Sequence, residues 1–318
     1  MQQTIKTVCS RYCVPRTVQQ SFYQPLSTRE HRGINRLTKM KTLRLIGMAI
    51  IAIIMGANFL ACSDDDDNNN EVNTINPQHV FPNGIPKQIA DMKITQNTQG
   101  LITKIETEDG TAVFEYPNTV TRAELANQHV KMTVTKDTGM ERDEIFIFDM
   151  EIGNNGFIKH SDETEEDGDF ETWDFEYTTE GNLKTLKRSE GGNETTTITY
   201  ENGNITEIYT ASKDEPTVSS TYKIDYTSNT VKSPIENKGG IMLYDQTLGI
   251  DMDEMDFAYY AGLLGKATKN LPLKLTYVSD VFNDIREFTW TLNANGLPTT
   301  LLLVEPAHST SKEITFIW

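Results

Sequence analysis

The stretch Trp173–Leu186, WDFEYTTEGNLKTL, is the clearest indication of the fold. Its first five residues alternate between aromatic and acidic side chains, which is the pattern of a strand with one buried face. Gly181 supplies a turn signal, and apolar side chains return at Leu183 and Leu186. The stretch therefore predicts two antiparallel strands that are joined by a short hairpin.

The same unit recurs along the chain. Tyr200–Ile208, YENGNITEI, repeats the aromatic strand end, the glycine turn and the returning aliphatic strand. Alternating runs also occur at Val130–Val134, Tyr222–Tyr226 and Phe288–Leu292, and several such runs are separated by Asn-Gly or Asp-Gly pairs. These pairs suit the positive φ angles of tight hairpins. We therefore expect residues 80–318 to form an all-β domain, built as a single antiparallel meander of many hairpins.

One segment departs from the strand pattern. Asp251–Gly265, DMDEMDFAYYAGLLG, has acidic residues at its start and a glycine at its end. The acidic residues suit the positive end of a helix dipole, and glycine is a common residue after a helix. Met255, Tyr259 and Leu263 would share one face of this helix. We expect one short helix at about residues 251–265 that packs on the sheet or plugs it.

The N-terminal part of the chain predicts export. Leu45–Ala57, LIGMAIIAIIMGA, is apolar and follows Lys41 and Arg44, as in a secretory signal peptide. This run is shorter than the ~20 residues of a membrane-spanning helix, which is the alternative. We expect residues 40–61 to be a lipoprotein signal peptide and residues 1–39 to be an over-extended gene start or a disordered leader.

The sequence around Cys62 resembles a bacterial lipobox, in which the cysteine is diacylated and becomes the new N-terminus. Ala61 and Cys62 fit that pattern, whereas Phe59 and Leu60 replace its usual leucine and small residue. The residues that follow resemble the export signal of Bacteroides-type surface lipoproteins: Ser63, Asp64, Asp65, Asp66 and Asp67. This resemblance implies a lipid anchor on the outer membrane and a domain that faces the cell exterior. The alternative is that residues 62–79 serve only as a solvated tether, because acidic and asparagine-rich sequence remains extended.

The composition of the mature chain excludes several classes of function. Cleavage before Cys62 removes nine Lys/Arg and one Glu, and it leaves 20 basic and 45 acidic residues with a net charge of −25. Such a chain repels nucleic acid. Cys9 and Cys13 precede the cleavage site, so we expect no disulfide, thiolate metal site or cysteine nucleophile.

The sequence lacks the common catalytic motifs. Gly262–Thr268, GLLGKAT, does not have the spacing of a phosphate-binding loop, and there is no Gly-x-Ser-x-Gly elbow. The four histidines of the mature chain do not form a zinc motif: His79, His129, His160 and His308. We therefore expect a protein that is not an enzyme.

Acidic clusters supply the candidates for a metal site, and calcium is the cofactor they would suit. Calcium takes six to eight oxygen ligands, and carboxylates gather at an expected hairpin tip and at the start of the expected helix. The candidate ligands are Asp167, Asp169, Asp251 and Asp253. The alternative is that the first cluster is a solvated turn and the second complements the helix dipole, so that the protein has no cofactor.

Tyrosines supply the candidates for a ligand-binding surface. Seven of them could stack on sugars at an end of the sheet: Tyr200, Tyr209, Tyr222, Tyr226, Tyr259, Tyr260 and Tyr277. Their positions in alternating runs favour the other interpretation, in which they are core residues.

The chain resembles a Bacteroides lipoprotein family of unknown function with a porin-like fold. Three stretches carry the resemblance: Tyr259–Tyr277 (YYAGLLGKATKNLPLKLTY), Trp290–Thr299 (WTLNANGLPT) and Ile314–Trp318 (ITFIW). The resemblance implies that the antiparallel meander curls into a barrel, and it supplies no catalytic residues. The ITFIW stretch also resembles the closing strand of outer-membrane barrels. However, most alternating runs are shorter than the ~9–11 residues of membrane strands, so we expect the apolar face to point inward and the acidic face to meet water.

Three functions remain open. The first is a non-catalytic binding or envelope module, an outer-membrane lipoprotein that captures a glycan or a protein. The second is a small pore-like barrel or a carrier of an apolar ligand, which needs a cavity beside the 251–265 helix. The third is a glycan or lipid hydrolase, which needs two carboxylates facing each other across a cleft. The lack of a catalytic motif favours the first.

Overall fold

The computed structural model describes residues 75–117, 128–137, 139, 143–166, 168–278 and 283–318. The expected leader, signal peptide, lipidated Cys62 and Ser63–Asp67 run lie outside the described residues, as does Asp167. The described residues belong to the second of two compact units, Asp67–Trp318. No helix within the described ranges is long and apolar enough to cross a membrane.

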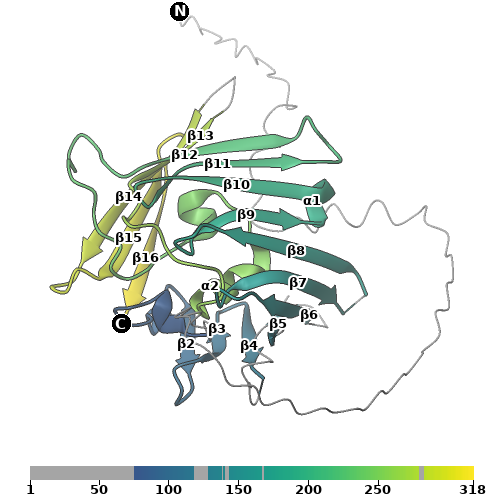
Figure 1. Cartoon of the computed structure of the whole chain (residues 1–318). Coiled ribbons are helices and arrows are strands. Elements are labelled where there is room, and N and C mark those ends of the chain that lie inside the picture. The colour runs from purple at the N-terminus through teal and green to yellow at the C-terminus, as the bar shows by residue number, and fades with distance from the viewer. Residues whose placement is uncertain (1–74, 118–127, 138, 140–142, 167, 279–282) are drawn as a thin grey trace, which may run out of the picture. The chain divides into compact units, whose positions relative to one another are not determined.

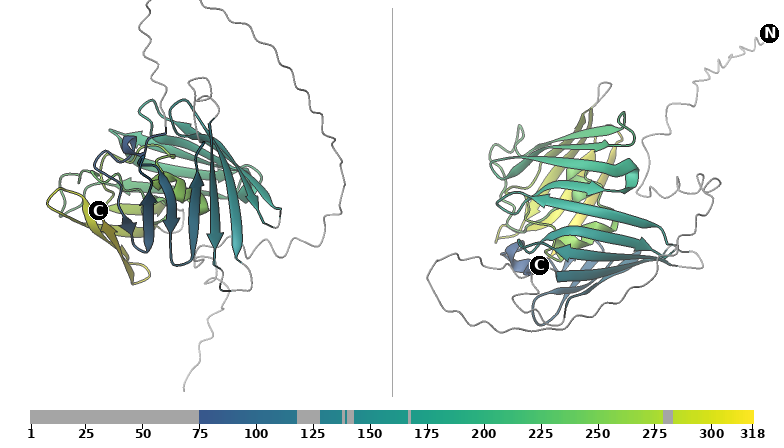
Figure 2. Two further views of the ribbon diagram at one scale, coloured as in Figure 1. Left: turned by 90° about the horizontal axis from the view of Figure 1, so that it is seen from below. Right: turned by 45° about the vertical axis from the view of Figure 1, so that its right-hand side comes forward.

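Sixteen antiparallel strands form a closed barrel (Figures 1 and 2). Each strand pairs with its neighbours in the chain, and β1 closes the barrel by pairing with β16 through Gln88 and Ile317. The structure therefore confirms the all-β meander and its closure into a barrel. The strands are β1 (Gln88–Ile89), β2 (Met92–Gln96), β3 (Ile102–Glu106), β4 (Gly110–Glu115), β5 (Gln128–Lys136), β6 (Glu144–Ile152), β7 (Ile158–Glu165), β8 (Phe170–Tyr177), β9 (Leu183–Arg188), β10 (Glu194–Glu201), β11 (Asn204–Ser212), β12 (Ser219–Asp225), β13 (Lys274–Val278), β14 (Asn283–Leu292), β15 (Pro298–Glu305) and β16 (Thr310–Ile317).

The hairpin that Trp173–Leu186 predicts is present as β8 and β9. Trp173 and Phe175 are buried, and the acidic side chains that follow each of them, Asp174 and Glu176, are exposed. The next unit of the repeat, β10–β11, turns at Asn202 and Gly203, whose φ angles are 53° and 82°. Two successive positive φ angles are those of the tight turn whose twist matches paired strands, and asparagine followed by glycine adopts them at low cost. The local turn chemistry thus specifies the meander.

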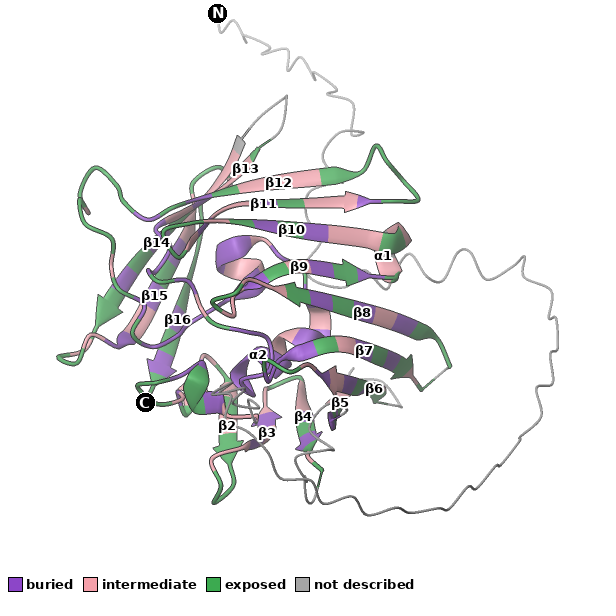
Figure 3. Ribbon diagram, viewed as in Figure 1, coloured by how far each residue is buried: buried purple, intermediate pink, exposed green. Residues whose placement is uncertain are grey.

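The apolar side of each strand faces into the barrel and the polar side faces water. In β5, Val130 and Met132 are fully buried while His129 and Lys131 are exposed. The same alternation runs around the wall (Figure 3). Membrane-spanning barrels have the reverse arrangement, with an apolar band outside and a polar lumen. This barrel therefore has the polarity of a water-soluble protein.

The chain between β12 and β13 enters the interior: its residues 227–236 are mostly exposed, whereas most of residues 237–273 are buried and fill the barrel. This interior segment, residues 226–273, contains a π-helix at Tyr244–Leu248 (η5), a 3-10 turn at Asp253–Asp256 (η6) and a short helix, α2 (Phe257–Tyr260). The expected helix is confirmed in kind and place, but it is shorter than 251–265. The helical turns end at Ala261 because Gly262 adopts a φ of 77° with its Cα against Pro77, where a Cβ would meet backbone at 2.6 Å.

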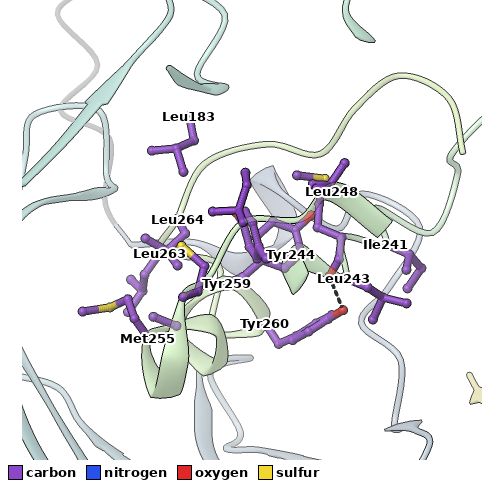
Figure 4. Close-up of a cluster of buried hydrophobic side chains, with 14 of the residues drawn as sticks. Leu183, Ile241, Leu243, Tyr244, Leu248, Met255, Tyr259, Tyr260, Leu263 and Leu264 are labelled. Atoms are coloured by element: carbon purple, nitrogen blue, oxygen red, sulfur yellow. Dashed lines mark hydrogen bonds between the residues drawn. The ribbon is translucent and has the colours of Figure 1, made fainter. Parts of the chain in front are cut away.

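Tyrosines of the interior segment make contacts with other residues of the same segment (Figure 4). The hydroxyl of Tyr259 donates to the carbonyl of Gly240 at 2.5 Å, and that of Tyr260 donates to Met242 at 2.7 Å. The Tyr259 ring packs edge-on against Tyr244 with a centroid distance of 5.6 Å. Burying an aromatic ring with its polar tip satisfied is favourable, so these tyrosines belong to the core.

One end of the barrel, here the sealed end, is closed by the interior segment. Its amides bond to hairpin turns of the wall: Lys266 N donates to Gly181 O and Lys269 N donates to Gly203 O, each at 2.8 Å. The C-terminal Trp318 lies against Gly239, and its indole donates to Pro298 O at 2.6 Å. The first described residues pack at this same end through Pro77 and Phe81. Both ends of the described chain therefore lie at the sealed end.

Candidate functional site

The opposite end, here the acidic end, carries the loops β5–β6, β7–β8, β9–β10 and β11–β12. The β9–β10 connection includes the four-residue helix α1 (Glu190–Asn193). Charged side chains point into the barrel here, in positions where the strands otherwise place apolar residues. Glu163 on β7 lies directly opposite Glu171 on β8, and Arg188 on β9 lies opposite Trp173. Glu163, Glu171 and Arg188 are buried, with exposed fractions of 4%, 6% and 7%.

Arg188 is the centre of this cluster. Its Nε donates to Glu171 at 3.1 Å, and one terminal nitrogen donates to Glu190 at 2.5 Å and to Asp253 at 2.6 Å. Asp251 lies 3.9 Å from the other terminal nitrogen. Arg188 thus joins the wall and α1 to the 3-10 turn of the interior segment. Such a buried pair costs desolvation, and removing one partner leaves an uncompensated charge.

Trp173 lies between the cation and a carboxyl. The guanidinium carbon of Arg188 is 4.5 Å from the centroid of the Trp173 ring, within the range of a cation–π interaction. The indole Nε1 donates to Glu163 at 2.9 Å. Trp173 has no exposed surface, so this arrangement is shielded from water.

A second cation contacts the interior segment. Lys136, at the end of β5, forms an ion pair with Glu254, whose side chain is 5% exposed. In the part of the chain that the structure describes, no cation forms an ion pair with the adjoining Asp256. Carboxylates therefore outnumber Lys136 and Arg188 around the 3-10 turn.

Burial raises the pKa values of these carboxyls. Desolvation raises the pKa of Glu163 to about 8, with repulsion from Glu171 adding to it and the Trp173 hydrogen bond opposing it. Desolvation raises the pKa of Glu171 to about 7 against the attraction of Arg188. Desolvation and neighbouring carboxylates also raise the pKa of Asp251 to about 6 and that of Asp256 to about 7. Burial disfavours the charge on Arg188, but Glu171 and Asp253 outweigh it and raise the Arg188 pKa.

The structure separates the candidate calcium ligands. Asp169 lies exposed in the β7–β8 turn, whereas Asp251 and Asp253 lie near Arg188 on the interior segment. Among the residues that the structure describes, no three His, Cys, Asp or Glu side chains are arranged to hold a metal ion. Asp251 and Asp253 therefore face a guanidinium.

The candidate tyrosines fall into three groups. Tyr226, Tyr259 and Tyr260 are buried, as the core interpretation predicts, and Tyr200 is partly buried. Tyr209 is 45% exposed on the outer wall, so the core interpretation is wrong for this residue. Tyr222 and Tyr277 lie opposite each other on β12 and β13, half-buried on the inner side, with ring centroids 5.3 Å apart.

The histidines lie apart from the acidic cluster. His129 lies 2.6 Å from Asp149, and His160 lies between Asp174 at 2.8 Å and Asp162 at 3.2 Å, all on the outer wall. The hydrogen bond to Asp174 raises the pKa of His160. The contacts with Asp149 and Asp174 join neighbouring strands at the surface, whereas Asp162 lies on the same strand as His160.

A polar hollow of about 220 Å³ lies beside α1. Its lining includes Thr172, Asp174, Lys187, Ser189, Asn193 and Lys213. The lining contains no aromatic residue, so it offers no platform for stacking a sugar.

The Arg188 cluster was not predicted from the sequence. A usable signal was present, because Glu171 and Arg188 occupy the apolar phase of their strands, two residues from Trp173 and from Leu186 respectively. A charged residue in that phase is expensive unless it is paired. The partners could not be named, because Asp253 lies 65 residues from Arg188 in the chain.

Comparison with known proteins identifies the family. A family model described as a domain of unknown function (DUF4595) with porin-like fold matches residues 87–300. The chain belongs to this family. The matched residues run from the first strand into β15, so the DUF4595 domain covers most of the barrel, and the expected resemblance is confirmed.

Two solved structures are similar to the DUF4595 barrel. A porin-like protein from Bacteroides uniformis ATCC 8492 is 16% identical, with a TM-score of 0.52, over 71% of this chain and 89% of that one. A porin-like protein from Bacteroides vulgatus ATCC 8482 is 13% identical, with a TM-score of 0.49, over 74% and 99%. The similarity to the Bacteroides uniformis protein supports the barrel fold and no particular function. No curated protein matches the chain.

Proposed function

We propose that the protein is a lipid-anchored, non-catalytic binding or envelope module of the outer membrane, which faces the cell exterior. The observation that carries this proposal is the polarity of the barrel, whose outer wall is charged and whose interior is apolar. A barrel that does not present an apolar band to lipid needs a separate membrane anchor, and Cys62 would supply it.

The filled interior argues against conduction and against carriage of an apolar ligand. Met255, Ala258, Tyr259, Leu263 and Leu264 have no exposed surface, so no water-sized space adjoins them. The cavity that a carrier would need beside this helix is therefore not present around these residues.

The arrangement of carboxylates also argues against a hydrolase. Glu163 and Glu171 lie directly opposite each other on the neighbouring strands β7 and β8. Both are buried, and Glu171 is paired with Arg188. A glycosidase needs its two carboxyls on either side of a cleft that admits a sugar. The buried pair offers no such opening.

The position of the chain ends supports an orientation for the module. Ile75 begins the described chain at the sealed end, so a tether from Cys62 would arrive there. A tether of thirteen residues, 62–74, would span at most about 45 Å if it were fully extended. The acidic end would then face away from the membrane, which suits it because anionic lipid repels carboxylates.

Protease shaving of intact cells tests the exterior location. The barrel should be cut while periplasmic proteins survive, and replacing Asp64–Asp67 by alanine should protect it. Equal protection of both forms would place the domain in the periplasm and remove the exterior part of the proposal.

The half-buried Tyr222–Tyr277 pair is the inner-face aromatic surface that a glycan ligand would use. A glycan array with the purified chain tests this ligand class. Tyr277→Ala should lower the affinity for any glycan hit at least tenfold, and Tyr209→Ala, which changes an exposed tyrosine of the outer wall, should not. Equal effects of the two substitutions would rule out the pair as the binding surface, and protein partners would then be screened.

A further inference from the structure

The interior segment meets the wall at the acidic end through a turn, residues 251–256, here called the tip. Arg188 on β9 holds Asp253, and Lys136 on β5 holds Glu254. Met252 and Met255 of the tip are buried, with exposed fractions of 2% and 0%. The tip therefore covers apolar surface while its charged groups attach it to two different strands.

The charges around the tip do not balance. Among the described residues, the facing groups are the cations Lys136 and Arg188, and the carboxyls Glu163, Glu171, Glu190, Glu194, Asp245, Asp251, Asp253, Glu254 and Asp256. Arg286 and Lys312 add cations beside Asp245, and Glu305 adds a carboxyl there. Glu165 adds a carboxyl beside Glu163. With every one of these carboxyls ionised, eleven negative charges would face four positive ones. Ionisation of the cluster therefore pushes the tip away from the wall.

The backbone of the tip is held in an unfavourable conformation. Asp253 has a φ of 42°, in the left-handed region that a residue other than glycine adopts at a cost. Its carboxylate accepts the 2.6 Å hydrogen bond from Arg188. Detachment from Arg188 would let this strain relax, so the attached state depends on the charge balance of the cluster.

We propose that residues 251–256 form a pH-dependent latch, which is closed over Trp173 in acid and is released from the wall as the pH rises. The sealed end stays in place, because backbone hydrogen bonds of Lys266 and Lys269 attach the interior segment there independently of charge. The latch is a property of the barrel and does not rest on the lipid anchor.

The direction of the effect follows from the carboxyls of the cluster. Desolvation raises the pKa of Glu163 to about 8, and those of Glu171 and Asp256 to about 7. A carboxyl with a raised pKa favours the packed state while it is protonated, and this advantage is lost as the pH rises through that value. Release is therefore expected between about pH 6 and pH 8.5.

Thiol reactivity measures the latch directly, because the three native cysteines all precede residue 75. In the full chain with Cys9, Cys13 and Cys62 changed to Ser, Met252→Cys places a buried thiol in the tip. Met150→Cys, at a fully buried position of the β6 wall, is the matched control. After correction for the thiolate fraction, the rate at residue 252 should rise at least tenfold from pH 5.5 to pH 8.5, while the rate at residue 150 stays constant.

Adding Glu163→Gln to the Met252→Cys chain should reduce the rise at least fivefold, since glutamine cannot ionise. Three outcomes overturn the proposal: a constant rate at residue 252, an equal rise at residue 150, or no effect of Glu163→Gln. Hydrogen exchange of the chain without any substitution in the barrel provides a second measurement. Corrected for intrinsic rates, exchange should speed up in residues 251–256 and not in residues 263–271, and uniform exchange would equally overturn the latch.

Discussion

Trp173 donates a 2.9 Å hydrogen bond to Glu163 in the interior of the barrel, where both side chains are buried. An indole can only donate, so it satisfies one oxygen of Glu163 whether that carboxyl is protonated or ionised. One such bond does not offset the removal of a carboxylate from water, and desolvation dominates the Glu163 pKa. The pair therefore makes the interior of the barrel sensitive to pH.

The barrel is expected to be more stable in mild acid than at pH 8.5. Glu163 and Glu171 have pKa values of about 8 and about 7, raised from 4.5 mainly by desolvation. Their contribution is fully present below about pH 4.5 and is lost as the pH rises through the raised values. Urea titrations should show the free energy of unfolding falling by about 6 kcal/mol from pH 5 to pH 8.5. A free energy that rises over this range would contradict the assignment.

Glu163→Gln should flatten that dependence. Removing one carboxyl that takes up a proton on folding should lower the slope by up to about 1.4 kcal/mol per pH unit near neutral pH. Glu176→Gln is the matched control, because Glu176 is exposed on the outer face of β8. If both variants keep the slope of the parent chain, Glu163 is not the titrating group.

Arg188→Met should destabilise the barrel by about 3–5 kcal/mol at pH 7, because Glu171, Glu190 and Asp253 lose their shared cation. The neighbouring Lys187 points outward and is exposed, so Lys187→Met should change the stability by less than about 0.5 kcal/mol. Urea titration of both variants checks this, and equal losses would mean that the buried ion pairs do not hold the acidic end.

Gly262→Ala should weaken the sealed end. The added Cβ would lie 2.6 Å from the Cα of Pro77, at a φ of 77°. Two causes act at Gly262, the cost of a positive φ for alanine and the clash with Pro77. Gly100→Ala measures the first cause alone, since Gly100 has a φ of 83° and nothing within 4 Å of the added Cβ. Thermal unfolding should show a loss of about 1 kcal/mol for Gly100→Ala and at least twice that for Gly262→Ala. A similar loss for both would mean that the contact with Pro77 adjusts freely.

Local pattern was sufficient to predict much of the fold. The alternation at Trp173 and Phe175 gave the direction of the β8 side chains, and the Asn202–Gly203 pair gave a hairpin, because both signals act between neighbours in the chain. The length of the helix was not predictable, because its end depends on Gly262 meeting Pro77, a contact between residues 185 positions apart in sequence. The path of residues 226–273 into the interior was not predictable either, because it also depends on contacts between residues that are far apart in the sequence.

The charged cluster shows the limit of such reasoning for the site. Acidic residues near Asp251 resembled calcium ligands in the sequence, since carboxylates alone do not reveal what faces them. Only the strand register, which pairs Trp173 with Arg188, brings a guanidinium to Asp253. The charges of Glu171 and Arg188 in apolar strand positions indicated where a buried charged site would lie, but they did not indicate which residues would pair with them.

We propose that this barrel stands in water and reaches the membrane only through its lipid. Residues 63–318, exported behind a cleavable signal peptide without a lipobox, test it by partition between the membrane and the detergent-free periplasmic fraction. We predict that this chain is recovered folded in the soluble fraction while the chain with Cys62 sediments with the outer membrane. Recovery of both chains in the membrane, resistant to carbonate extraction, would mean that the barrel itself inserts into lipid, and would overturn this proposal.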